Sequence, residues 1–132
     1  MQMKYLALLA TLVFSVMFSS ASFAEWTKLV GSVKGNTFYV DFERIKIHDG
    51  YVYYWELLDF LKPSPQGDLS GKMYNQGDCK LFRYKMLSGS FHKEPMGRGT
   101  GAIDSYKNPE WIYPPPKSSI EGVLKAVCDH VK

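Results

Sequence analysis

Two cysteines, Cys79 and Cys128, constrain this chain most, because they follow an N-terminal segment with the pattern of an export signal. A thiol pair that reaches an oxidising compartment usually forms a disulfide. A bridge here would close a loop of about 50 residues and, in the chain-entropy model, stabilise the fold by about 4 kcal/mol. We therefore expect a domain whose C-terminal element is fastened to the middle of the chain.

The N-terminal segment, residues 1–24, has a basic start, an apolar run over residues 5–18 and a small-residue end at Ser22 and Ala24. This pattern predicts a signal peptide that is cleaved before Glu25. The apolar run is shorter than the ~20 residues that span a bilayer, so we expect no membrane span after cleavage. No cysteine stands at the cleavage site, so a lipoprotein is not expected. The predicted location is periplasmic, or secreted and at the cell surface.

The remainder, residues 25–132, has the length of a single domain. Removing Lys4 with the leader leaves 15 basic against 13 acidic residues, a formal charge of +2. Nucleic-acid-binding domains concentrate basic residues far more strongly. We expect no nucleic-acid partner.

Alternating apolar and polar residues predict several strands, separated by turn sequences. The Asp49-Gly50 pair is a strong hairpin signal, and the aromatic stretch that follows it predicts a central strand. Proline and glycine mark residues 62–71 as a surface loop. The expected strands are residues 26–33, 37–42, 44–48, 51–60 and 80–87, with a last extended piece at 111–113.

A C-terminal helix is predicted from its cap and its apolar stripe. Ser118 and Glu121 fit a capping box. Six apolar residues fall on one helical face: Ile120, Val123, Leu124, Val127, Cys128 and Val131. The stripe presents Cys128 to the sheet, as a bridge to Cys79 requires. The predicted fold is α+β: an antiparallel β-sheet of about five to six strands with one C-terminal α-helix packed on it and disulfide-linked to it.

Catalytic, metal and cofactor motifs are missing from the sequence. The three histidines, His48, His92 and His130, lack metal-ligand spacing, and no G-x-S-x-G motif occurs. Glycines between Gly97 and Gly101 are typical of a connector, because no helix pattern follows them. A hydrolase would need two carboxylates to converge, from Asp41, Glu43 and Asp59. We expect no catalytic residue, no metal, no cofactor and no enzyme activity.

A modest basic face is the candidate ligand-binding region. Its residues are Lys72, Lys80, Arg83 and Lys85. On a strand, Arg83 and Lys85 share one side and Lys80 alternates to the other. Complementary charge would attract an acidic partner, although a solvated sheet face also explains these residues. The nearby aromatic run, residues 51–55, fits either core packing or a carbohydrate or peptide groove.

An ordered set of residues resembles the surface-adhesin protein E family of Gram-negative bacteria. The set is Trp26, Phe38 to Asp41, Trp55, Asp78-Cys79, Arg83, Gly97 to Gly101, Trp111 and Val127-Cys128. The resemblance covers nearly all of residues 25–132. It implies a small antiparallel-sheet domain with a helix held by the Cys79–Cys128 bridge. It also implies binding to host extracellular proteins such as vitronectin, laminin and plasminogen.

Two functional hypotheses follow. The first is an exported, non-enzymatic domain that binds a host protein through the sheet around Arg83 and Lys85. The second is a periplasmic envelope protein with the same fold and no host contact, which the missing lipidation cysteine favours. An exposed edge strand also permits a homodimer.

Overall fold

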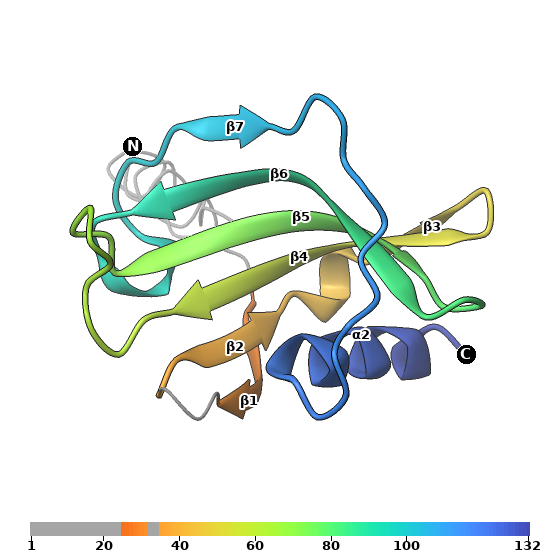
Figure 1. The fold of residues 1–132 in the computed structure, drawn as a ribbon. Helices are drawn as coiled ribbons and strands as arrows, with labels where there is room; N and C mark the ends of the chain where they lie inside the picture. Colours follow the sequence, from red (N-terminus) through yellow and green to blue (C-terminus); the bar gives the residue numbers. More distant parts are fainter. Residues whose placement is uncertain (1–24, 32–34) are drawn as a thin grey trace, which may run out of the picture.

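The computed structural model of the chain describes residues 25–31 and 35–132. The signal peptide expected over residues 1–24 lies outside the described residues. Within these described residues seven strands form one antiparallel sheet in the order β1-β2-β4-β5-β6-β7, and β3 pairs with the other end of β4 (Figure 1). The strands are β1 (Thr27–Gly31), β2 (Thr37–Val40), β3 (Lys46–His48), β4 (Tyr51–Asp59), β5 (Ser70–Asp78), β6 (Arg83–His92) and β7 (Ile103–Ser105).

The hairpin predicted at Asp49-Gly50 is present, and the first two strands also pair with each other. β1 pairs antiparallel with β2. β3 pairs with β4 across Asp49 and Gly50, whose φ angles are 50° and 80°. Two consecutive positive φ values are the conformation of a type I′ turn, which the Asp-Gly pair favours.

The central strand is β4, as expected. It pairs with β2 and β3 on one side and with β5 on the other. Val52 and Tyr54 point to one face, where they pack with Phe38 and Val40 of β2. Helix α2 (Ser119–His130) covers this face and adds its buried residues Val123, Leu124, Val127 and Cys128 to the core.

The helix begins at its predicted cap. The side chain of Ser118 accepts a hydrogen bond from the backbone N–H of Glu121 at 3.1 Å. The Glu121 carboxylate reaches one residue further back than a capping box requires, since it accepts from the N–H of Lys117 at 3.1 Å. Lys117 has a φ of 63°, so the chain turns sharply into the helix.

Cys79 and Cys128 form the predicted disulfide, with their Cα atoms 5.6 Å apart. Cys79 lies in the turn between β5 and β6. The bridge therefore joins the helix to a turn at the end of the sheet. With this bond, the α+β fold expected from the sequence is confirmed, with seven strands instead of five or six.

Several boundaries differ from the expectation. β5 was not predicted, and it begins at Ser70, inside the expected loop. β6 begins at Arg83, because Lys80 belongs to the preceding turn. β7 was also missed, and the expected last strand is a single bridge between Ile112 and Tyr84. This bridge holds the long connection from β7 to α2 against β6. Within the described residues, no helix has the length and apolar character to cross a membrane.

Candidate functional site

An aromatic strip runs across the sheet face opposite the helix. Because side chains alternate along β4, Tyr51, Tyr53 and Trp55 point away from the core face of Val52 and Tyr54. Tyr74, the direct partner of Trp55 on β5, lies between two of them. Its ring centroid is 4.9 Å from that of Trp55 and 6.2 Å from that of Tyr53.

Trp111 extends this strip from the connection after β7. Its ring lies 5.4 Å from Tyr51, centroid to centroid. The five rings of the aromatic strip are half-buried, so each offers part of its surface to a partner. We define the aromatic strip as Tyr51, Tyr53, Trp55, Tyr74 and Trp111.

Two cations stand over the Trp111 ring. The guanidinium carbon of Arg83 is 4.2 Å from the ring centroid, and Nζ of Lys85 is 4.4 Å from it. Arg83 also donates from Nε to Oδ2 of Asp78 at 2.9 Å, so its charge is paired. Among the described residues no carboxylate lies within ion-pair distance of Lys85, whose charge is available to a partner.

An irregular pairing between β5 and β6 decides which side chains share this face. Tyr74 pairs with Ser88, but the next residue, Asn75, pairs with Met86, so Leu87 is an extra residue in β6. A bulge of this kind shifts the alternation by one. Odd-numbered Arg83 and Lys85 before the bulge therefore share a face with even-numbered Ser90 and His92 after it.

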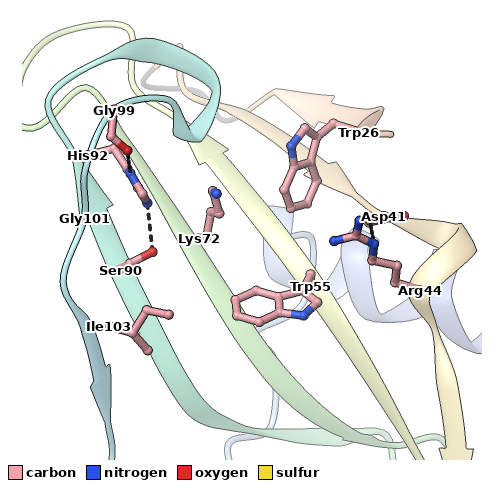
Figure 2. A pocket seen from close by; sticks show the side chains of 10 residues that line it. All are labelled: Trp26, Asp41, Arg44, Trp55, Lys72, Ser90, His92, Gly99, Gly101 and Ile103. Carbon is pink, nitrogen blue, oxygen red and sulfur yellow. Dashed lines mark hydrogen bonds and ion pairs between the residues drawn. The ribbon is translucent and has the colours of Figure 1, made fainter. Parts of the chain in front are cut away.

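A cleft of about 310 Å³ opens on the same face, at the other end of the strip. Figure 2 shows the Trp26 and Trp55 rings on two sides of it, with the Lys72 side chain between β4 and β6. Its lining residues are Trp26, Asp41, Arg44, Trp55, Lys72, Ser90, His92, Gly99, Gly101 and Ile103.

One end of the cleft holds a buried carboxylate. Asp41 is 1% exposed, and neither of its side-chain oxygens has a hydrogen-bond partner. Nε of Arg44 lies 3.5 Å from Oδ2, close enough for an ion pair but not for a hydrogen bond. The Arg44 side chain is half-exposed, so the ion pair joins a buried acid to a cation that solvent reaches.

The opposite wall holds a hydrogen-bonded serine and histidine (Figure 2). Nε2 of His92 is 2.8 Å from Oγ of Ser90, and its Nδ1 is 3.1 Å from the carbonyl oxygen of Gly99. A carbonyl oxygen only accepts, so Nδ1 carries a proton. When the His92 ring is neutral, Nε2 accepts a hydrogen bond from the Ser90 hydroxyl. The imidazole then donates nothing to Oγ of Ser90.

Three of the four predicted binding residues share the strip face. Lys72 lines the cleft, while Arg83 and Lys85 stand over Trp111. Lys80 is exposed in the β5–β6 turn, where its N–H donates to Asp78. Sequence reasoning missed the roles of Trp26, Arg44 and Trp111, which reach this face from segments far apart in the chain.

The arrangement expected of a hydrolase is absent from the described residues. Asp41 lines the cleft, but Glu43 is exposed and Asp59 accepts a hydrogen bond from the N–H of Met96 at 2.9 Å. No group of three histidine, cysteine or acidic side chains gathers there as metal ligands either. What the described site offers is a surface of aromatic rings, cations and one buried acid.

Comparisons with known proteins agree with this architecture. The family model described as surface-adhesin protein E matches residues 26–129. Crystal form II of Haemophilus influenzae protein E has a TM-score of 0.64 at 17% identity, covering 85% of this chain and 94% of that one. A second structure of Haemophilus influenzae protein E has a TM-score of 0.61 at 17% identity, covering 83% of this chain and 87% of that one. The protein E structure from non-typeable Haemophilus influenzae has a TM-score of 0.58 at 17% identity, covering 84% of this chain and 79% of that one. At 17% identity these similarities show that the chain shares the fold of protein E. No curated protein sequence matches the chain.

Proposed function

This chain belongs to the surface-adhesin protein E family, and from that premise we propose that it is an exported, non-enzymatic domain that binds a partner protein through its aromatic strip. The expected partners are host extracellular proteins such as vitronectin, laminin and plasminogen. Export is supported by the leader pattern in residues 1–24 and by the Cys79–Cys128 disulfide, which is typical of an oxidising compartment.

The stacking of Arg83 and Lys85 on Trp111 carries the proposal. Tryptophan, tyrosine and arginine are the residues that most often dominate binding energy at protein interfaces. Stacking on the ring holds both long side chains in place, so less side-chain entropy is lost on binding. The unpaired charge of Lys85 favours an acidic patch on the partner and makes the association sensitive to salt.

Binding is tested on the full chain, purified from the periplasm of an expression host so that export and oxidation occur. Association with immobilised vitronectin, laminin and plasminogen is followed by interferometry over a salt series. We expect saturable binding to at least one of them that weakens as salt rises. Saturation with none of the three would overturn the host-adhesin version.

Matched variants locate the binding face. Trp111→Ala removes the ring that holds both cations, and we expect about tenfold weaker binding or more. Lys85→Met removes one charge and should weaken binding by about three- to tenfold at low salt. Lys125→Met removes a charge from the exposed side of α2 and should bind like the unaltered protein. Equal losses in Lys85→Met and Lys125→Met would exclude the aromatic strip as the binding face.

Access to the host is tested by protease treatment of intact cells. An adhesin is digested while the outer membrane is intact. Digestion only after the outer membrane is ruptured would support the second hypothesis, a periplasmic envelope protein without host contact. Its partner would then be an envelope component that binds the same face of the sheet in the periplasm.

A further inference from the structure

The cleft beside Trp26 lies apart from the Trp111 end of the aromatic strip and has its own chemistry. Trp26 and Trp55 line two of its sides, one from the segment before β1 and one from β4 (Figure 2). Flat apolar rings of this size favour a ligand with flat C–H faces. The volume of about 310 Å³ suits one or two sugar-sized rings.

The charged residues of the cleft favour a ligand with one negative group. The lining of the cleft carries one acid, Asp41, and two cations, Arg44 and Lys72. Arg44 faces Asp41, whereas no carboxylate of the described residues lies within ion-pair distance of Lys72. The stem of Lys72 packs against Gly97, since a Cβ on that glycine would collide with it. The ammonium group therefore lines the cleft without a counter-ion among the described residues.

The cleft also holds acceptors that a simple anion would not use. Both oxygens of Asp41 are buried without a hydrogen-bond donor, which is costly unless a donor is supplied. When His92 is neutral, the Ser90 hydroxyl donates a hydrogen bond to Nε2 of His92, so the Ser90 oxygen can accept one from a ligand. A carboxylate alone would pair with Lys72 but carries no donor for these oxygens, whereas a sugar ring carries hydroxyl donors beside its carboxylate.

We propose that this cleft binds an acidic saccharide, a pyranose ring that carries a carboxylate. The ring stacks on Trp55 and Trp26, the carboxylate pairs with Lys72, and the hydroxyl groups donate to Ser90 and, after a rotation of the Arg44 side chain, to Asp41. This ligand goes beyond the proposed protein partner and does not use Arg83, Lys85 or Trp111.

The test uses the exported full chain and four probes followed by tryptophan fluorescence and by saturation-transfer NMR. The acidic sugars are methyl glucuronide and the methyl glycoside of N-acetylneuraminic acid. Methyl glucoside is the neutral control, and a glutamate-containing tetrapeptide is the control for a bare carboxylate. We expect at least one acidic sugar to bind about tenfold tighter than methyl glucoside and than the peptide.

Variants separate the cleft from the rest of the face. Lys72→Met keeps the stem against Gly97, so the fold should persist while binding of the acidic sugar falls to the level of methyl glucoside. Trp26→Ala should lower the affinity for both sugars, and Lys85→Met should leave both unchanged. Thermal melting checks that each variant is folded. Equal binding of neutral and acidic sugars, tighter binding of the peptide, or an undiminished Lys72→Met protein would overturn the proposal.

Discussion

The carboxylate of Glu56 accepts a hydrogen bond from Nδ2 of Asn75 at 2.9 Å, and both side chains are buried on the core side of the sheet. The hydroxyl-bearing rings of Tyr54 and Tyr84 are also on this side. Burial raises the pKa of Glu56 from 4.5 to about 7, and the hydrogen bond from Asn75 lowers it by less. Between pH 4.5 and about 7, Glu56 therefore keeps its proton in the folded protein but has lost it in the unfolded chain.

This pair makes stability fall as the pH rises. Between pH 4.5 and 7 the folded state binds more protons than the unfolded state, so unfolding becomes easier with each step up in pH. The rise in the pKa of Glu56 corresponds to about 3 kcal/mol of stability, which is fully present below pH 4.5 and is lost as the pH rises through 7. Glu56→Gln keeps an acceptor for Asn75, so we expect a flatter pH profile and higher stability at pH 8. Urea denaturation from pH 5 to 8 measures the free energy of unfolding of each protein, with exposed Glu110→Gln as the control. Parallel pH profiles for Glu56→Gln and the unaltered protein would contradict this role of Glu56.

Loss of the disulfide should cost about 4 kcal/mol. Cys79 and Cys128 are 49 residues apart, and opening a loop of this length enlarges the unfolded ensemble. The double variant Cys79→Ala with Cys128→Ala is compared with the oxidised protein by guanidinium denaturation. Dithiothreitol should lower the stability of the unaltered protein to that of the double variant and leave the variant unchanged. A difference below about 1 kcal/mol would show that the bridge adds little.

Gly77→Ala should destabilise the contact between the sheet and the helix. A Cβ at this position would lie 2.8 Å from Cγ2 of Val52 and 3.1 Å from Cδ1 of Leu124. Overfilling a packed core of this kind costs about 1–3 kcal/mol. Gly71→Ala, on the same strand, is the matched control, because its Cβ would meet mainly the side chain of half-exposed Phe91. Equal melting temperatures for the two variants would contradict the close approach of α2 to β5.

Asp78 organises the turn that carries Cys79. Its carboxylate accepts from the N–H groups of Lys80 and Leu81 at 3.1 and 3.2 Å and from Nε of Arg83 at 2.9 Å. Burial opposes its ionisation, but these hydrogen bonds outweigh burial and hold its pKa below the usual value of 3.8. Asp78→Ala should cost about 1–3 kcal/mol at neutral pH.

The pH dependence of that loss identifies its cause. Because the folded pKa is lowered, the contribution of Asp78 is complete above the unfolded pKa and declines as the pH falls below it. The gap in stability between Asp78→Ala and the unaltered protein should therefore narrow in strong acid. Denaturation at pH 7 and pH 3 measures it, and a gap of constant size would mean that the ion pair and hydrogen bonds are not its source.

Local chemistry explains why the β3–β4 hairpin and the helix could be predicted. Asp49-Gly50 determines its own turn, and Ser118 determines its own helix start, so neither depends on distant residues. β5 could not be found this way. It carries Gly71, Asn75 and Gly77, which disfavour strands, and it forms because β4 and β6 pair with it on both sides.

The candidate site was only partly predictable for a related reason. Arg83 and Lys85 share a face because they are two residues apart, and this much the sequence pattern indicated. That Ser90 joins them depends on the extra residue at Leu87, which no local signal marked. The placement of Trp111 depends on the path of the connection that Ile112 fastens to Tyr84.

The helix that covers β1 and β2 comes last among the described elements, while those two strands come first. During synthesis and translocation the apolar face of Phe38 and Val52 therefore has no cover until nearly the whole chain is available. Such a partly made chain is prone to associate with others and is a natural client for a chaperone. The Cys79–Cys128 disulfide joins this last element to the turn between β5 and β6, so it holds the cover in place once the helix has docked.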